Sequence, residues 1–373
     1  MEYAALVVLT LIGLSAGIFV DVEDDEDDAA SAADAGSDIS ATDTETAATT
    51  TGDTDSAGTD TSVTTNGSDS GTTLDGVTFG TETGDTLTAS EGAQTVEGAG
   101  GDDQITGNSS NNILDGQVGD DSVFGGDGAD QVFGSEGNDS LDGNSGDDLV
   151  AGGTGNDIIA GGLGNDALFG DAGDDLLDGQ EDDDELDGGE GNDTLFGGPG
   201  NDIIFGGDGN DSILDGLGDD SLFGGAGADT LDGGEGDDRI FGVWDGDTDD
   251  VISARDLDDP DVLLGGQGDD EIQMGSGDVA FGEEGTDLFI TGTWVDPENA
   301  PEIIDLEESE VVLVSVPAGT STDASVTIET DELTGDSIVQ FNGQTVVTVS
   351  SGSGPVSLDQ ILVVEVAALA QAT

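Results

Sequence analysis

The chain has 373 residues, of which 87 are acidic and only 2 are basic, so its formal net charge is −85. It contains no cysteine and no histidine, which excludes disulfides, thiolate or imidazole zinc sites, and catalysis by Ser-His-Asp or Cys-His groups. Such a chain lacks the basic surface that nucleic acids require, and it must stay unfolded, live in high salt or bind cations in bulk.

The chain opens with an 18-residue apolar run at residues 3–20, which is long enough to cross a bilayer as a helix. Glu2 precedes the run where a secretory signal peptide has basic residues, and no A-x-A cleavage site comes after it. Residues 1–20 are therefore interpreted as an apolar anchor or signal segment. An uncleaved helix that tethers the chain to a membrane is favoured over a cleaved export signal or a buried segment.

Residues 21–79 consist mainly of Asp, Glu, Thr, Ser, Ala and Gly, with few large apolar side chains. Such a segment cannot bury enough apolar surface to offset its conformational entropy. We expect a disordered acidic linker that holds the rest of the chain away from the apolar segment.

A nine-residue repeat begins at Gly98, and internal repeats decide the fold. Residues 98–241 divide into 16 units with no insertion, of which GGTGNDIIA at 152–160 is a good copy. Position 1 is Gly in 15 units, position 4 is Gly in 14, position 6 is Asp in 15, and position 8 is Val, Ile or Leu in all 16. Two degenerate units at 80–97 precede this block in phase and look like a cap.

The repeats are interrupted once and then give way to a different segment. We place the repeat block at 98–247, an insertion loop at 248–264 and resumed, imperfect repeats at 265–290. Residues 291–373 are poorer in glycine, with strands expected at 311–316, 325–328, 337–341 and 344–349. The last two flank Asn342-Gly343, a strong signal for a tight hairpin turn. We expect a small antiparallel β module that caps the repeats.

The repeat predicts an all-β fold, a parallel β-roll. Six turn-forming residues and then three strand residues make half a coil, so 18 residues complete one coil. Strand alternation turns position 8 inward and positions 7 and 9 outward. The position-6 side chains then fall into two ladders. One ladder contains Asp103, Asp121, Asp139, Asp157, Asp175, Asp193, Asp211 and Asp229, and the other contains Asn112, Asp130, Asp148, Asp166, Asp184, Asp202, Asp220 and Asp238.

These ladders require a cation. Each unit buries only one aliphatic side chain, which does not offset the entropy of ordering nine residues, and stacked carboxylates repel one another. A divalent ion between successive loops reverses that repulsion. Hard carboxylate and carbonyl oxygens on a flexible loop suit Ca²⁺ better than Mg²⁺, so we expect calcium binding and folding to be one event.

Units such as GGPGNDIIF at 197–205 and GGEGNDTLF at 188–196 resemble those of the RTX, or haemolysin-type, calcium-binding repeat family, whose GGxGxDxUx units form a parallel β-roll. The resemblance covers the repeat region and implies calcium ions between loops one coil apart, held by position-6 aspartates and turn carbonyls. The gaps between aspartates in the two ladders then imply about 13 calcium ions in the regular block. The implied ligands are the ladder aspartates, with Asp247 and Asp270, and turn glycines represented by Gly152, Gly153, Gly155, Gly188, Gly189, Gly191, Gly197, Gly198, Gly200, Gly206, Gly207 and Gly209. Unit 179–187 has Asp182 in place of the position-4 glycine, so we expect distortion there.

Two smaller signals leave alternatives open. Residues 245–256 resemble an EF-hand calcium loop, but Asp250 replaces its glycine, so a solvated loop is favoured over an extra calcium site. Position 9 carries phenylalanines that share one outer face. This strip is either a partner or self-association face, or a set of aromatic side chains that fill strand edges or lie under the C-terminal module. Its members are Phe133, Phe169, Phe205, Phe223 and Phe241.

RTX proteins typically leave Gram-negative bacteria by type I secretion under an uncleaved carboxy-terminal signal, and the tail at 357–373 resembles such a signal. The apolar amino terminus departs from that pattern, but both routes end outside the cytoplasm. We expect a non-enzymatic, extracellular or surface-tethered module with a structural or adhesive role, a cell-surface or self-association partner and no nucleic acid. The alternative is a secreted, carboxylate-dependent carbohydrate-active enzyme with RTX repeats, against which the missing histidine and the short non-repeat segments weigh.

Overall fold

The computed structural model of the chain describes residues 72–74, 76–90, 94–242, 260–317 and 325–366. The predicted helix at 1–20, nearly all of the predicted linker at 21–79, the EF-hand-like loop at 245–256 and the end of the tail at 367–373 lie outside these residues. The described end of the predicted linker is ordered: Thr72–Leu74 and Val77–Phe79 pair as strands, and the second of them pairs in parallel with Thr95–Glu97, so the roll begins before residue 80. Within the described ranges, no helix has the length and apolar character needed to span a membrane.

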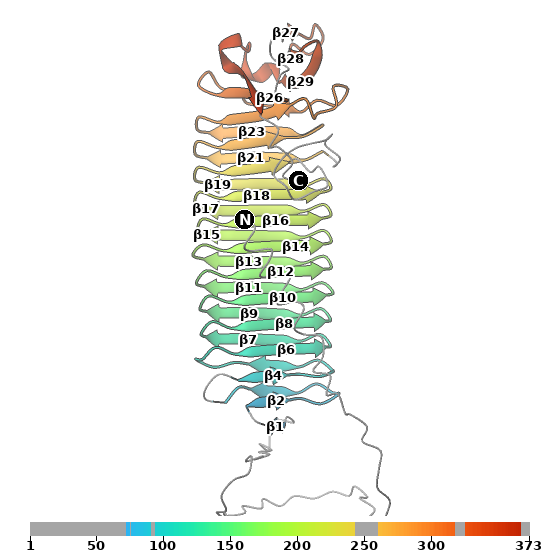
Figure 1. Ribbon diagram of the computed structural model, residues 1–373, viewed down its shortest axis with the longest axis vertical. Coiled ribbons are helices and arrows are strands. Elements are labelled where there is room, and N and C mark those ends of the chain that lie inside the picture. Colours follow the sequence, from blue (N-terminus) through green and yellow to red (C-terminus); the bar gives the residue numbers. More distant parts are fainter. Residues whose placement is uncertain (1–71, 75, 91–93, 243–259, 318–324, 367–373) are drawn as a thin grey trace, which may run out of the picture. The chain divides into compact units, whose positions relative to one another are not determined.

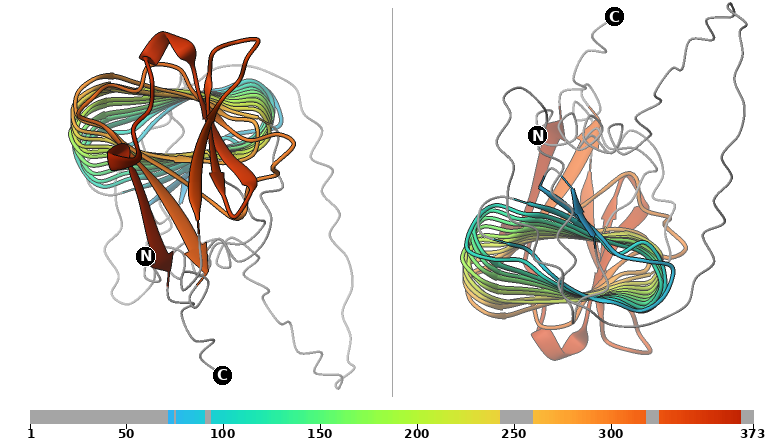
Figure 2. Two further views of the ribbon diagram at one scale, coloured as in Figure 1. Left: turned by 90° about the horizontal axis from the view of Figure 1, so that it is seen from above. Right: turned by 90° about the horizontal axis from the view of Figure 1, so that it is seen from below.

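The described residues form two 15-stranded β-sheets, and within the repeat block the chain passes from one to the other at every turn (Figure 1). Seen end-on, the coils stack into a flattened ring with one sheet along each long side (Figure 2). The first sheet contains, in spatial order, β1 (Thr72–Leu74), β2 (Val77–Phe79), β4 (Thr95–Glu97), β6 (Ile113–Val118), β8 (Gln131–Glu136), β10 (Leu149–Thr154), β12 (Ala167–Ala172), β14 (Glu185–Glu190), β16 (Ile203–Asp208), β18 (Ser221–Ala226), β20 (Arg239–Gly242), β22 (Glu271–Met274), β24 (Leu288–Gly292), β26 (Val311–Pro317) and β30 (Ile361–Val366).

The second sheet contains, in spatial order, β3 (Thr86–Thr88), β5 (Gln104–Thr106), β7 (Ser122–Asp127), β9 (Ser140–Ser145), β11 (Ile158–Leu163), β13 (Leu176–Glu181), β15 (Thr194–Pro199), β17 (Ser212–Leu217), β19 (Thr230–Glu235), β21 (Val262–Gln267), β23 (Val279–Glu284), β25 (Glu302–Ile303), β29 (Gln344–Val349), β28 (Ser337–Phe341) and β27 (Val326–Thr330). Two short 3-10 turns, η3 (Ser351–Ser353) and η4 (Leu358–Gln360), lie near the end of the described chain.

Neighbouring strands in the repeat block are parallel and are offset by 18 residues. Leu177 pairs with Ile159 on one side and with Leu195 on the other. This register confirms the predicted parallel β-roll, with two units to a coil.

The strands are longer than the three residues expected. Most strands of the block have six residues, which cover positions 7–9 of one unit and positions 1–3 of the next. Pairing of β11 with β13 runs from Ile158 to Ala160, skips position 1 at Gly161 and resumes at Gly162 and Leu163. Position 1 is therefore a break within a longer strand, so the turn is confined to positions 4–6.

The core of the roll consists of two columns of aliphatic side chains, with one side chain from each strand of the repeat block. All 16 position-8 residues, from Ile105 to Ile240, are at most 2% exposed. Positions 7 and 9 are exposed or half-buried, as in β11, where Ile158 is 55% exposed and Ile159 is 1% exposed. The predicted alternation of inward and outward positions is confirmed.

Unit 179–187 is less distorted than expected. Asp182 takes the left-handed backbone that glycine normally supplies at position 4, with φ of 78°. Its N–H donates to the carbonyl of Pro199 one coil on, at 3.0 Å, as the position-4 glycines of other units do. The irregularity is confined to β13, whose last residues are not paired with β15 although its first three are.

The roll resumes earlier than the predicted boundary at residue 265. Strand β21 begins at Val262 and pairs with β19, so the register places Leu263 beside Leu231 in the core. The aliphatic side chain at position 8 fixes this phase, and the predicted insertion loop at 248–264 therefore ends inside the roll.

The C-terminal segment continues both sheets. The predicted hairpin is confirmed, since β28 and β29 are antiparallel and Asn342 and Gly343 have positive φ of 54° and 79°. The expected strand at 311–316 differs, because β26 lies parallel to β24 and adds another rung to the roll. Residues 361–366 of the predicted secretion tail form β30, which is parallel to β26.

Candidate metal centre

Every position-6 residue of the repeat block lies directly before a strand, at the edge where the chain turns from one sheet into the other. The two predicted ladders run along the two edges, one before the strands of each sheet. All 16 of these side chains are at most 4% exposed. The sequence placed these residues correctly relative to one another, and the structure adds that their carboxylates are buried.

One oxygen of each ladder carboxylate is fixed by the neighbouring coil. The backbone N–H of Asp139 donates to Oδ1 of Asp157 at 2.7 Å, and that of Asp157 donates to Oδ1 of Asp175 at 2.7 Å. The same bond joins successive residues along both ladders in the repeat block, with N···O distances of 2.6–2.9 Å.

The second oxygen of each of these carboxylates has no hydrogen-bond donor among the described residues. Oδ2 is buried and unpaired in all 15 position-6 aspartates of the regular block. An ionised oxygen buried without a partner is strongly unfavourable, so 15 of the 16 units carry a group that calls for a proton or a cation.

Glycines keep the space around these oxygens open. A Cβ on Gly152 at position 1 would meet Oδ2 of Asp157, and a Cβ on Gly134 would lie 2.7 Å from the carbonyl oxygen of Gly152. Position 1 is thus a place where a free carboxylate oxygen and a backbone carbonyl of the next coil come together. Gly155 at position 4 is required for a different reason, because its φ is +130° and a Cβ there would overlap the carbonyl of Gly137.

The remaining glycines singled out from the sequence repeat these two roles. Position-1 glycines lie against the Oδ2 of their own unit's aspartate, and glycines at positions 2 and 4 lie against the backbone of the preceding coil. The first group is Gly188, Gly197 and Gly206, and the second is Gly153, Gly189, Gly191, Gly198, Gly200, Gly207 and Gly209.

Burial raises the pKa values of the ladder carboxylates. Desolvation is the largest cause, and it outweighs the hydrogen bond from the preceding coil, which lowers the pKa. The pKa of Asp139 and of Asp175 rises to about 7, and that of Asp184 to about 8. Charges of neighbouring ladder aspartates add to the rise in these three cases.

No basic side chain of the described residues reaches the ladders. Arg239 lies at the surface, with its Nε 3.8 Å from Glu271. Among the described residues, no positive side chain balances the buried negative charge of the ladders.

These observations fit calcium. Free carboxylate oxygens and nearby backbone carbonyls are the hard ligands that Ca²⁺ prefers. The residues that would hold the ions are the position-6 aspartates, with carbonyls at position 1. A bound ion would supply the positive charge that the roll itself lacks.

The ladders are longer than the sequence analysis proposed. The N–H of Asp85 donates to Asp103, and at the other end Asp229 is followed by Asp261 and Asp238 by Asp270. Asp278 and Asp287 extend the two ladders further, each 17 residues on. The signal was an Asp two residues before a buried position-8 side chain, as in Asp85-Thr86-Leu87, but the glycine pattern around it is degraded.

Two predicted ligands have different outcomes. Asp270 lies in the ladder, between Asp238 and Asp287. Asp247 lies outside the described residues, and the place after Asp229 is taken by Asp261, because the chain inserts 14 extra residues before that coil. The ladder therefore continues through Asp261 and not through Asp247.

The sequence analysis missed a further series of hydrogen bonds, which joins exposed side chains at position 5. The N–H of Asn156 donates to the side-chain oxygen of Asn138 at 2.9 Å, and that of Asn192 donates to Asp174 at 2.9 Å. These bonds run back to the preceding coil, opposite in direction to those of position 6. The frequent Asn and Asp at position 5 were the available signal in the sequence. Their side chains link successive turns by hydrogen bonds on the outside of the roll.

Comparison with known proteins agrees with this geometry. No curated protein matches the chain. The family model of the RTX calcium-binding nonapeptide repeat matches it in five segments, at residues 79–114, 106–141, 142–177, 178–213 and 214–249. Together with the parallel roll and its two aspartate ladders, these matches identify residues 79–249 as RTX calcium-binding nonapeptide repeats.

Proposed function

We propose that this chain is an extracellular structural or adhesive module whose roll assembles as its ladders take up calcium. The observation that carries the proposal is the series of 15 buried position-6 carboxylates in the regular block, each with one oxygen held by an N–H of the preceding coil and one oxygen unpaired. Since no described basic side chain balances them, calcium uptake and folding are coupled.

The number of ions depends on the length of the ladders. With Asp85, Asp261 and Asp278 added, one ladder has eleven aspartates and ten gaps. With Asp270 and Asp287 added, the other has nine aspartates and eight gaps. We propose that calcium fills these gaps, so that the fully loaded chain holds more ions than the 13 or so expected from the regular block alone.

An extracellular location supplies the calcium that the roll needs. RTX repeats are typical of secreted bacterial proteins, and calcium is abundant outside the cell. We propose export either through the apolar segment at 3–20, which would then tether the roll to the membrane, or through the carboxy-terminal tail.

We propose that the chain has a non-enzymatic role. The chain has no histidine, cysteine or lysine, three of the side chains that most often serve as catalytic bases or nucleophiles. Its buried position-6 carboxylates from Asp103 to Asp238 repeat one arrangement along the ladders. This regularity favours a scaffold with a cell-surface or self-association partner.

Metal analysis after equilibrium dialysis tests the calcium part of the proposal. The full chain, dialysed against millimolar CaCl₂ with excess Mg²⁺ present, is expected to retain well over ten calcium ions per molecule, in line with the number of ladder gaps. Retention of only one or two ions, or equal retention of Mg²⁺, would refute it.

A further inference from the structure

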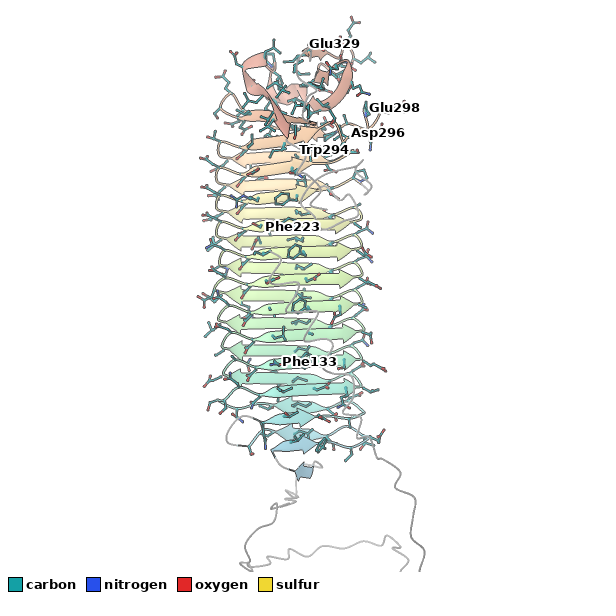
Figure 3. The ribbon with its side chains drawn as sticks, viewed as in Figure 1. Phe133, Phe223, Trp294, Asp296, Glu298 and Glu329 are labelled. Atoms are coloured by element: carbon teal, nitrogen blue, oxygen red, sulfur yellow. The ribbon has the colours of Figure 1, made fainter. Side chains whose placement is uncertain are left out.

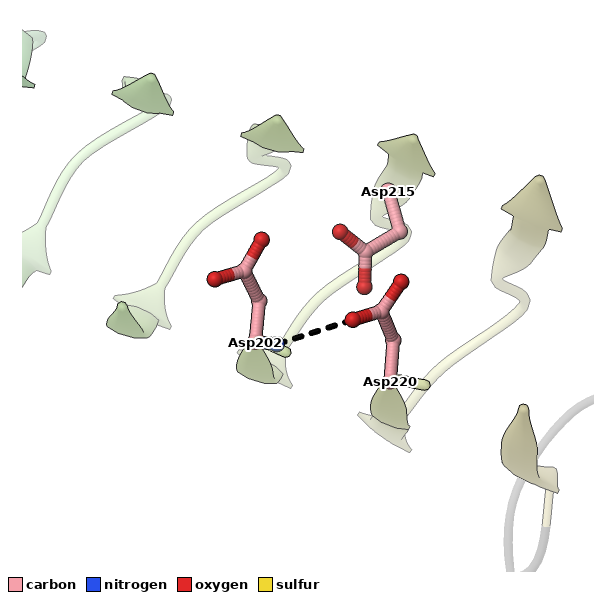
Figure 4. A group of neighbouring side chains, drawn as sticks. All are labelled: Asp202, Asp215 and Asp220. Carbon is pink, nitrogen blue, oxygen red and sulfur yellow. Dashed lines mark hydrogen bonds between the residues drawn. The ribbon is translucent and has the colours of Figure 1, made fainter. Parts of the chain in front are cut away.

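One gap in the ladders differs from all the others in the regular block. Asp215 occupies position 1, where the other 15 units have glycine. It lies in β17, and its carboxylate approaches those of Asp202 and Asp220, which stand directly before β16 and β18 in the other sheet (Figure 4). One oxygen from each of the three lies within 4.8 Å of the others.

All three side chains are buried, and their free oxygens point into one space. Asp202, Asp215 and Asp220 are 1%, 4% and 1% exposed. Oδ1 of Asp220 accepts the N–H of Asp202 at 2.8 Å, as in a regular gap. Both oxygens of Asp215, and Oδ2 of the other two residues, have no hydrogen-bond donor among the described residues.

The Asp215 carboxylate reaches back towards the preceding coil. A Cβ on Gly197 would meet Oδ1 of Asp215 and would lie 2.6 Å from Oδ2 of Asp202. In the regular gap one coil earlier, a Cβ on Gly179 would instead lie 2.7 Å from the neutral carbonyl of Gly197. At this gap, then, a side-chain carboxylate oxygen lies closest to the position-1 glycine, which in the preceding gap lies near a backbone carbonyl.

Three buried carboxylates at this separation repel one another strongly unless a proton or a cation lies among them. The affinity of oxygen sites for Ca²⁺ rises with the number of charged ligands. We propose that Asp202, Asp215 and Asp220 form a distinct calcium site that binds more tightly than the regular gaps and fills first, so that ordering of the roll begins there. The inference rests on the proposed uptake of calcium by the ladders.

Competition of the full chain with a chromophoric calcium chelator measures the tightest binding step. The wild-type chain is expected to show one ion bound roughly tenfold or more tightly than the rest. Asp215→Asn, which keeps the shape and removes the charge, is expected to lose that step while the total number of ions stays the same. Asp215→Gly should likewise give the isotherm of a uniform ladder.

Asp208→Asn is the matched control, because it removes one charge from an exposed position 3 of the neighbouring strand β16. It is expected to retain the tight step. A wild-type isotherm with a single class of sites would overturn the inference and leave the proposed function standing. So would an Asp215→Gly chain that binds one ion more than wild type, since Asp215 would then block the gap. A wild-type chain that binds no calcium would end both.

Discussion

Each position-6 aspartate uses its two oxygens differently. Oδ1 of Asp157 accepts the N–H of Asp139 in the coil before, which orients the carboxylate, while Oδ2 stays free at the turn. A hydrogen bond from the backbone thus orients the carboxylate whether or not an ion is bound. This division explains why glutamate, with its longer side chain, does not appear at position 6 of the regular block.

Asp157→Ala should weaken calcium-dependent folding. The substitution removes a carboxylate that serves the gaps on both sides, and it leaves the N–H of Asp139 without its acceptor. We expect about two fewer ions bound and a several-fold higher calcium concentration at the folding midpoint. Glu190→Ala is the control, because Glu190 is an exposed position-3 residue; equal effects of the two substitutions would contradict the role of the ladder.

Substitutions of two adjacent isoleucines test whether the core depends on position 8. Ile159 at position 8 is 1% exposed and Ile158 at position 7 is 55% exposed. In the calcium-loaded chain, Ile159→Ala should lower the free energy of unfolding by about 2–5 kcal/mol, whereas Ile158→Ala should cost less than about 1 kcal/mol. Denaturant titration measures both. Similar losses would show that the core does not depend on position 8.

At the scale of the ladder, the pKa values predict how pH acts. Folding of the metal-free roll raises the pKa of Asp139 and of Asp175 from 3.8 to about 7, chiefly by desolvation. The metal-free folded state therefore binds more protons than the unfolded chain. Its stability is greatest below about pH 4 and is lost as the pH rises through about 7.

The expected result in chelator is a gain of β structure at pH 5 that is absent at pH 8, seen by circular dichroism. With calcium present, protons compete for the same oxygens, so the apparent calcium affinity should fall as the pH drops below 7 and binding should release protons. Calcium affinity that is constant between pH 8 and pH 5 would contradict the burial of ionised carboxylates at the ladder.

The outer face of the first sheet carries a stack of aromatic rings on β16, β18 and β20. The ring centroids of Phe205 and Phe223 are 4.8 Å apart, and those of Phe223 and Phe241 are 4.5 Å apart. Phe133 lies on the same face, in line with Phe223 along the stack of coils (Figure 3). These rings are half-buried, so they stabilise the sheet and also leave apolar surface at the outside.

Replacing two of these rings tests the face as a contact for other molecules. If it mediates self-association, Phe205→Ser/Phe223→Ser should shift sedimentation towards the monomer and reduce association with cells, while calcium binding is retained. The variant Ile158→Ser, on the other sheet, controls for loss of an exposed apolar side chain. Unchanged sedimentation and unchanged cell association would contradict an interaction role for this face.

The sequence analysis predicted the features of the regular repeats and missed the ladder residues in degenerate units. The register at positions 6 and 8 was enough for the parallel roll, the two ladders and the aliphatic columns, because each depends on one residue type at a fixed spacing. Asp85, Asp261 and Asp287 were missed, because their units have lost the glycines that mark a repeat. Asp215 stood out only as an exception at position 1, since its contact with Asp202 is made between coils and appears only in three dimensions.

The C-terminal segment shows a different limit. Local turn chemistry at Asn342-Gly343 predicted the hairpin, but nothing local reveals that β26 and β30 add parallel rungs to the first sheet. Which strand pairs with which depends on the exposed edge that the roll offers at its end. The buried side chains of Val312 and Val314 show that this edge is covered by apolar contacts.

Across the whole roll, each coil contacts only its neighbours, so stability is a sum of weak units and the interfaces between them. Each unit adds one buried aliphatic side chain, together with a carboxylate whose burial opposes folding. Calcium changes the sign of that second contribution at every interface. A chain built in this way should therefore order cooperatively once the first gaps are filled.

Far-UV circular dichroism and limited proteolysis of the full chain, first in EDTA at low ionic strength and pH 8 and then during addition of calcium, test the coupling of calcium uptake to folding most directly. We predict a coil-like, protease-sensitive chain in EDTA and a cooperative gain of β signal and protease resistance as calcium is added, with Mg²⁺ far less effective. A β-rich, protease-resistant chain that persists after exhaustive removal of calcium would contradict that coupling.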